Sequence, residues 1–320
     1  MTLYSESRKK YLTINPFDQS WGLAINSVGR QNIAENEEYP PQGHPTRYLF
    51  DIQKGRILNE YQLLYITKGK GLFSSEPSGL CLIREGSMFL LFPGERHTYR
   101  PDESTGWNEY WIGFNGAIMD EWVRNGFFTK ENPVFNVGVN EEIISLYKKA
   151  IMIADAQEAN YQQALAGTVC NLVSMAIYLS RNRDFNRSDI SVQINNAKAA
   201  VYENISTITP EKLAEIICMS YSRFRKIFKE YTGFAPSQYI QEVRINMAKE
   251  LLTNTSKSIK EIAFELGYEN KDYFFTAFRK VSGMTPAGYR KMTRGEEDYN
   301  ASQISLERPV TDTITSSGKP

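Results

Sequence analysis

The C-terminal third of this 320-residue chain repeats itself, and the repeat constrains its fold more than any other feature of the sequence. Five residues return in the same order fifty positions later: Phe224, Phe228, Gly233, Pro236 and Tyr239 recur as Phe274, Phe278, Gly283, Pro286 and Tyr289. The periodicity across 195–294 is helical, and a Gly-x-x-Pro step interrupts it after each pair of phenylalanines. We therefore predict an all-α segment made of two copies of one unit.

Each copy has the pattern of a helix-turn-helix. A short apolar helix is followed by a tight turn and then by the helix that carries the phenylalanines, which lie four residues apart and so face the first helix. The opposite face is free to enter the major groove of DNA, where basic and hydroxyl side chains suit phosphates and base edges. That face carries Ser222, Arg225, Lys226 and Lys229 in the first copy, and Lys271, Asp272, Phe275 and Thr276 in the second.

A helix over 236–252, between the copies, would place the two recognition helices about 34 Å apart, which is one turn of DNA. The alternative is a plain helical bundle with a solvated basic face. Charge favours DNA: the chain has 37 basic and 37 acidic side chains, but residues 190–294 carry 16 basic and 10 acidic ones. This net charge of +6 is typical of a nucleic-acid-binding segment attached to a neutral or acidic one.

The segment 209–290 resembles the DNA-binding domain of AraC/XylS-type bacterial transcription regulators. Four features of its second copy carry the resemblance: Gly267-Tyr268, Phe274 with Phe278-Arg279, Gly283 to Pro286, and Tyr289-Arg290. By motif position, the base-contacting sites of that family fall on Ser222, Arg225 and Lys226 in the first copy. In the second copy they fall on Lys271, Asp272, Phe275 and Thr276. Phe275 departs from the small or polar residue usual in the family. It either contacts a thymine methyl or leaves the second copy reading fewer bases.

The front half is predicted to contain strands and then helices. Short apolar runs at about ten-residue spacing over 45–115 indicate a sandwich or small barrel, with turns between them. The runs are RYLFDI, QLLYIT, LCLI, SMFLLF and EYWIGF. From Glu141 the period becomes helical, and a second apolar stripe over 158–182 includes Leu165, Leu172 and Leu179. Asn171 and the helical spacing favour a packed amphipathic helix over a membrane span.

Residues 17–182 resemble the sensor domain of the same family, a cupin-like β-barrel followed by a helical pair. The resemblance rests on the segments 61–71, 85–99 and 106–114. In sugar-responsive members it implies a ligand inside the barrel, contacted here by Arg56, Tyr99, Glu109 and Trp111. Alternation along the last strand also sends Trp107, Glu109 and Trp111 to one face, a composition unusual for a dry core, although these indoles are equally compatible with plain core packing.

Two histidines, His44 and His97, leave little material for a metal site, and one imidazole cannot hold a transition metal alone. His97 is expected to be structural or to bond a ligand, and His44 to line the pocket mouth or to be an ordinary loop residue. No metal, cofactor or catalytic residue is predicted. Three separated cysteines and an N-terminus without an apolar h-region favour a reducing cytoplasm.

The prediction is thus an α+β two-domain protein, with a sensing and dimerisation domain at 1–182, a linker at 183–194, a double helix-turn-helix at 195–294 and a disordered tail at 295–320. We expect a homodimer that pairs through Leu172 and Leu179, binds double-stranded DNA and a small effector such as a sugar, and has RNA polymerase as a possible partner. We expect a ligand-responsive regulator of carbohydrate genes that is not an enzyme. The alternatives are a cupin-type enzyme fused to a DNA-binding module and a protein-binding helical repeat.

Overall fold

The computed structural model describes residues 7–40, 45, 48, 50–186 and 189–295, which fall into two compact units, 1–188 and 189–320. The predicted tail from 296 onward and His44 lie outside the described residues. Most of the predicted linker 183–194 is helical, because α4 continues to Asn186 and α5 begins at Ile190. Ile194 is fully buried in the second unit, so packing, and not the polar composition around it, determines this segment.

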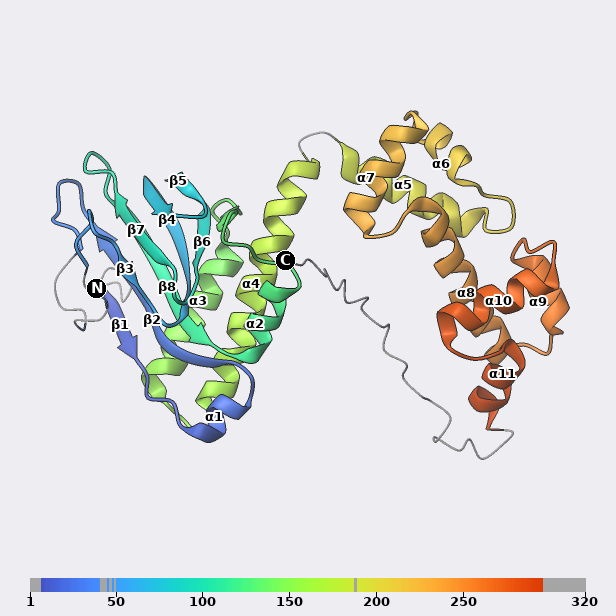
Figure 1. The fold of residues 1–320 in the computed structure, drawn as a ribbon, viewed down its shortest axis with the longest axis horizontal. Helices are drawn as coiled ribbons and strands as arrows, with labels where there is room; N and C mark the ends of the chain where they lie inside the picture. The colour runs from blue at the N-terminus through green and yellow to red at the C-terminus, as the bar shows by residue number, and fades with distance from the viewer. Residues whose placement is uncertain (1–6, 41–44, 46–47, 49, 187–188, 296–320) are drawn as a thin grey trace, which may run out of the picture. The chain divides into compact units, whose positions relative to one another are not determined.

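The N-terminal unit contains a nine-stranded sheet, with the order β1-β2-β8-β4-β6-β9 along its main path (Figure 1). Strands β5 and β7 pair with the second half of β4, and β3 pairs with β7. All the strand pairs are antiparallel. The strands are β1 (Arg8–Tyr11), β2 (Ala24–Ile33), β3 (Arg56–Ile57), β4 (Tyr61–Ser75), β5 (Gly79–Arg84), β6 (Ser87–Leu91), β7 (Arg96–Pro101), β8 (Trp107–Asn115) and β9 (Val134–Asn136).

Strand β4 belongs to two layers. Its first half pairs with β6 and β8, and its second half pairs with β5 and β7, with a register irregularity between Ile66 and Lys68. The α+β two-domain fold is confirmed, but the pairings among the described residues do not close the sheet, so the predicted cupin-like β-barrel is corrected on this point. The strand runs QLLYIT, LCLI, SMFLLF and EYWIGF are confirmed, but RYLFDI forms no described strand, and β1 and β2 were not predicted.

Two apolar cores lie on opposite faces of the sheet. Along β8, Trp107 and Trp111 face a core between the two layers, while Tyr110 and Ile112 face a core shared with the helices. The alternation predicted for this strand is therefore confirmed. It places Glu109, which is 5% exposed, on the inner face between the two tryptophans.

The helices α3 (Glu141–Ala156) and α4 (Tyr161–Asn186) cover the outer face of the sheet as a pair (Figure 1). By length and composition, α4 is apolar enough to cross a membrane. Its stripe, however, packs into the core that the helices share with the sheet, where Leu165, Val169 and Leu172 are fully buried. Leu172 thus cannot pair with a second subunit as predicted, because its own unit already encloses it, and Leu179, the other predicted position, is half-buried against the same core. Two shorter helices, α1 (Pro16–Ser20) and α2 (Ala117–Arg124), complete this unit.

The C-terminal unit is all-α, as predicted. Its helices are α5 (Ile190–Glu203), α6 (Pro210–Ile216), α7 (Tyr221–Thr232), α8 (Pro236–Asn254), α9 (Ile259–Glu265), α10 (Lys271–Ser282) and α11 (Pro286–Arg294). Helix α8 contributes Ile240 and Val243 to one core and Ile245, Ala248 and Leu252 to another. One continuous helix, about 28 Å long at 1.5 Å per residue, therefore joins the two copies of the repeat.

The Gly-x-x-Pro steps end one helix and start the next. Gly233 and Gly283 follow α7 and α10 with φ of 81° and 77°, a left-handed conformation that favours glycine. Pro236 and Pro286 each occupy the first helical turn that follows, where no backbone N–H is needed. The copies differ in the turn before the recognition helix, which is one residue longer in the second copy. Cys218 and Gly267 occupy equivalent left-handed positions, with φ of 54° and 79°, so the extra residue lies between Tyr268 and Lys271.

Candidate functional site

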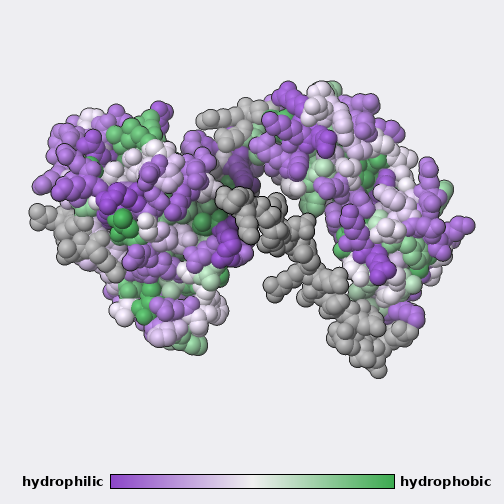
Figure 2. Space-filling model, viewed as in Figure 1, coloured by the Kyte–Doolittle hydropathy of each residue, from purple (hydrophilic) through white to green (hydrophobic). Residues whose placement is uncertain are grey.

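The first recognition helix, α7, buries Phe224 and Phe228 and exposes the opposite face. Ser222, Arg225, Lys226 and Lys229 are all exposed there, as the 3.6-residue period predicts. Arg223 and Glu230 flank this face. The surface of the C-terminal unit is mostly hydrophilic in the view of Figure 2. The helix therefore presents a cluster of cations and one hydroxyl to solvent, which is the chemistry that phosphates and guanine edges accept.

The second recognition helix, α10, presents a different surface from the same backbone positions. Lys271, Asp272 and Thr276 are exposed, and Phe275 is half-buried. The ammonium of Lys271 lies 5.2 Å from the centre of the Phe275 ring, a cation–π distance. Asn270 caps the helix by accepting a hydrogen bond from the backbone N–H of Asp272. Only Lys271 is cationic among the predicted contacts here, so this helix offers fewer phosphate partners than α7.

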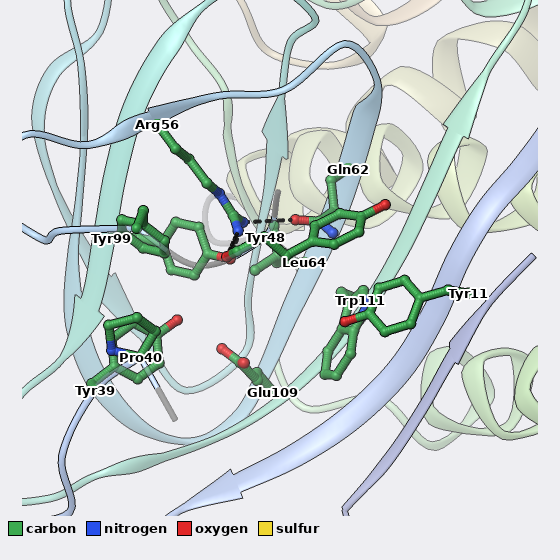
Figure 3. A pocket seen from close by; sticks show the side chains of 11 residues that line it. Tyr11, Tyr39, Pro40, Tyr48, Arg56, Gln62, Leu64, Tyr99, Glu109 and Trp111 are labelled. Carbon is green, nitrogen blue, oxygen red and sulfur yellow. Dashed lines mark hydrogen bonds between the residues drawn. The ribbon is translucent and has the colours of Figure 1, made fainter. Parts of the chain in front are cut away.

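A pocket lies on the inner face of the sheet, and all four residues predicted for it line it (Figure 3). Arg56 comes from β3, Tyr99 from β7, and Glu109 and Trp111 from β8. Residues that sequence reasoning missed complete the lining: Tyr11, Tyr39, Pro40, Tyr48, Phe50, Gln62 and Leu64. A polar Gln62 inside the apolar run of β4 was the one visible signal, since a buried amide requires a hydrogen-bond partner.

Arg56 is 9% exposed, and its hydrogen-bond partners among the described residues are neutral groups. Its Nη2 donates to the hydroxyl of Tyr99 at 2.6 Å and to Oε1 of Gln62 at 3.3 Å, and its Nη1 donates to the carbonyl of Tyr48. The Phe50 ring lies 4.7 Å from the guanidinium carbon. None of the ion pairs found among the described residues includes this guanidinium. A buried cation held by neutral acceptors is well placed to attract an oxygen-rich ligand.

His97 orients Arg56 from the neighbouring strand. The two residues are opposite each other in the β3–β7 register, and the Nε of Arg56 donates to Nε2 of His97 at 3.3 Å. Burial, reinforced by the charge of Arg56, lowers the pKa of His97 to about 4. The ring is therefore neutral near pH 7, with Nδ1 3.0 Å from the carbonyl of Glu95. His97 does not line the pocket itself but supports Arg56 from behind, which corresponds to the structural role, one of the two expected for it.

Glu109 faces the pocket from β8 (Figure 3). Burial raises the pKa of Glu109 to about 7, and the charge of Arg56 opposes that rise. Its Oε2 and the indole N–H of Trp107 are both buried without a hydrogen bond of good geometry among the described residues, although Trp107 lies close enough to lower the pKa of Glu109 slightly. Unpaired polar atoms of this kind cost free energy unless a ligand satisfies them.

Trp111 stands beside Glu109 because β2 makes room for its ring. A Cβ on Gly29, opposite Trp111 in the β2–β8 register, would overlap the indole. Trp107 packs against the rings of Tyr39 and Tyr99, at 6.1 Å and 6.3 Å between ring centres, and belongs to the core. The tryptophans therefore divide the two roles: Trp111 lines the pocket and Trp107 supports it.

The pocket is nearly filled in this state. The enclosed space is about 30 Å³, which holds water but not a ligand the size of a sugar. Aromatic rings from the segment before β3 take up the room: Tyr39 lies 6.4 Å from Phe50 and 6.1 Å from Tyr99, centre to centre. A ligand would have to displace Tyr39 and Phe50. Among the described residues, no cluster of three or more His, Cys, Asp or Glu side chains is placed to hold a metal ion.

Comparison with known proteins matches a family to each of the two units, the one with the recognition helices and the one with the pocket. Residues 213–292 match a family described as a helix-turn-helix domain, and residues 37–169 match the AraC-like ligand binding domain. The chain belongs to the AraC family. It is an AraC-type DNA-binding transcription regulator with a ligand-binding domain, and the resemblance inferred from its motifs is confirmed.

Three relatives illustrate the range of this AraC family. The raffinose operon transcriptional regulatory protein RafR of Pediococcus pentosaceus is 26% identical over 76% of this chain and 88% of its own length. The arabinose operon regulatory protein of Escherichia coli (strain K12) is 26% identical over 74% of this chain and 80% of its own. The bifunctional transcriptional activator/DNA repair enzyme AdaA of Bacillus subtilis (strain 168) is 41% identical, but over only 30% of this chain and 46% of its own.

Proposed function

We propose that this AraC-family protein is a carbohydrate-responsive regulator, in which a sugar bound in the N-terminal pocket changes how the C-terminal unit engages its operator. The observation that carries the proposal is the set of groups around one buried space: the Arg56 guanidinium, the unpaired Oε2 of Glu109 and the Trp111 indole. Sugar hydroxyls both donate and accept hydrogen bonds, and a pyranose also has an apolar face on which an indole can stack. The raffinose and arabinose operon regulators among the relatives support the same class of effector.

Calorimetric titration of the full-length protein with raffinose, lactose and L-arabinose tests this proposal. Binding of at least one sugar is expected, and Glu109→Gln should weaken it about tenfold or more, the loss expected when a charged hydrogen-bond partner is removed. The exposed Glu76 offers a matched control, since Glu76→Gln should leave the affinity unchanged. Absence of binding by every sugar, or equal weakening by both variants, would refute a carbohydrate site here.

The DNA interface of the proposal consists of the exposed positions on the two recognition helices. Ser222, Arg225, Lys226 and Lys229 form its first half, and Lys271, Asp272, Phe275 and Thr276 its second. The cations of α7 would contact phosphates and base edges, while the α10 ring would contact a thymine methyl. We place the protein in the cytoplasm, beside RNA polymerase at its promoters, and assign it no enzymatic activity. Stoichiometric iron, manganese or zinc in the purified protein would argue against that last assignment.

We also propose a homodimer, with the predicted surface moved from Leu172 to the outer side of α4. There Tyr178 is 60% exposed and Phe127 is 54% exposed, and together with Ile177 and Trp122 they line an apolar groove of about 440 Å³. Sedimentation of the full-length protein should show a dimer that Tyr178→Glu dissociates. Met152→Glu, at an apolar position on α3 that is 72% exposed, should leave the dimer intact; a wild-type monomer at high micromolar concentration would contradict the proposal.

A further inference from the structure

Gln162, in the first turn of α4, is 1% exposed and bonds the sheet in an unusual way. Its Oε1 accepts a hydrogen bond from the backbone N–H of Ile25 at 2.9 Å, and its Nε2 donates to the carbonyl of the same residue at 3.0 Å. The β2–β8 register shifts between Ile25 and Ser27, so Asn26 is the extra residue of a β-bulge. One side chain of α4 thus holds the strand at the residue that precedes the bulge.

The bulge turns the Asn26 side chain toward a buried carboxylate. Its Nδ2 donates to Oε2 of Glu60 at 2.5 Å, and the Tyr48 hydroxyl donates to Oε1 of Glu60 at 3.0 Å. Glu60 is 5% exposed. The lack of a side chain at Gly113 makes room for it, since a Cβ there would lie 2.5 Å from Oε1 of Glu60. The carboxylate therefore has little freedom to move without moving its partners.

Tyr48 connects this carboxylate to the ligand pocket. Its hydroxyl bonds Glu60, while its backbone carbonyl accepts from the Nη1 of Arg56, whose Nη2 bonds Tyr99. A continuous series of hydrogen bonds and one strand segment therefore runs from Arg56 through Tyr48, Glu60 and Asn26 to Gln162. Asn26 is half-buried, and the other members of the series are buried inside the N-terminal unit. Hydrogen bonds in such an interior are strong, and their loss is costly.

We propose that Gln162 is a positioning residue that couples the pocket to helix α4 through the β2 bulge. A group that binds Arg56 shifts the carbonyl of Tyr48, and with it Glu60 and the Asn26 bulge. Gln162 then passes this displacement to α4, the last helix before the DNA-binding unit in the sequence. In this proposal the bulge is the element that takes up two arrangements, as such coupling requires. The ligand response rests on the proposed function, but the coupling itself exists without ligand.

Hydrogen–deuterium exchange of the full-length protein, without DNA or sugar, tests this coupling. In Gln162→Leu, peptides that cover 24–28 and also peptides that cover 48–62 should exchange about fivefold faster, which corresponds to about 1 kcal/mol for a lost buried hydrogen bond. Gln163→Leu is the matched control. It removes a bond to Asp18 from the same turn of α4 and should not change exchange over 48–62. Gln162→Glu keeps the acceptor for Ile25 N–H and should restore part of the protection.

A substitution at the pocket end of the series tests the same coupling in case Gln162→Leu folds poorly. Tyr48→Phe removes the hydroxyl that bonds Glu60 and should accelerate exchange in peptides that cover 24–28 and 158–166, because coupling between two sites is reciprocal. Faster exchange confined to the mutated element, or the same pattern in Gln163→Leu, would overturn the proposal. Since no sugar is present, failure of the carbohydrate assignment would leave this result unaffected.

Discussion

The two units of the molecule place their polar groups in opposite ways. Among the described residues of the N-terminal unit, five acidic, basic or histidine side chains are buried: Asp18, Arg56, Glu60, His97 and Glu109. Across residues 189–295, no acidic, basic or histidine side chain is buried, and the cores are built from aliphatic and aromatic residues. One unit is therefore organised around an interior that can interact with a ligand, while the other keeps its charges on the surface for DNA.

This difference has an energetic meaning. A buried charge destabilises its unit unless partners or a ligand compensate it, so the stability of the N-terminal unit should respond to pH. An apolar core has no such dependence, and its stability should depend on packing alone.

Truncating a core ring of the C-terminal unit should have the largest effect on stability, and this effect should be confined to that unit. Phe228 is fully buried between Phe224 and Tyr239, at 5.1 Å and 5.3 Å between ring centres. Phe228→Ala should lower the free energy of unfolding of this unit by about 3–5 kcal/mol, as the cavity it leaves is unfilled. Denaturant titration measures the loss. Phe234→Ala, at a 42% exposed position, should cost about 0.5 kcal/mol; equal losses would show that the core is not packed as described.

The Glu109→Gln variant should change how the stability of the N-terminal unit depends on pH. Folding raises the pKa of Glu109 from 4.5 to about 7, so the native state binds this proton more tightly and wild-type stability should fall as pH rises from about 5 to 7. The contribution is about 3 kcal/mol at 1.36 kcal/mol per pKa unit.

The pKa of His97 moves the other way, from 6.5 to about 4, so its contribution to stability rises over the same pH range. Because His97 is present in both proteins, the difference between wild type and Glu109→Gln isolates Glu109. Urea titrations between pH 5 and 8 measure that difference. Parallel profiles for the two proteins would mean that Glu109 is not held in a desolvated environment.

Arg225→Ala should weaken operator binding by about 1–3 kcal/mol and relax base preference at one position of the site, while leaving stability unchanged. Lys229→Ala should weaken all sequences alike and lower the salt dependence of binding by about one counterion, because it would contact a phosphate. Fluorescence anisotropy with the operator and with single-base variants separates the two effects. Unchanged affinity and preference in Arg225→Ala would place the recognition face elsewhere.

Helix caps should give the smallest effect and test the repeat itself. Ser258 caps α9: its hydroxyl oxygen accepts a hydrogen bond from the backbone N–H of Glu261. The Oε2 of Glu261 accepts a hydrogen bond from the backbone N–H of Ser258. Ser258→Ala should cost about 1 kcal/mol of unfolding free energy. Ser220 precedes α7 without a side-chain cap, so Ser220→Ala is the matched control with almost no cost. Thermal unfolding distinguishes the two, and equal shifts would contradict this assignment of the caps.

Local periodicity alone was enough to determine the architecture of the C-terminal unit. The spacing of Phe224 and Phe228, and of their counterparts fifty residues later, specified which helix faces are buried, because the helical period depends only on neighbouring residues. It also gave Arg225 and Lys229 their exposed positions. The same reasoning placed Glu109 and Trp111 together on one face of β8, since side chains alternate along any strand.

Only the tertiary structure decided how the sensor pocket is completed. Arg56 meets His97 through strand register, and Tyr48 and Gln62 reach the same guanidinium from segments whose neighbours the local sequence does not reveal. It also decided that the sheet stays open and that Leu172 belongs to its own core. These outcomes depend on contacts between residues far apart in the chain, which follow from the packing of whole layers and are not encoded in any local pattern.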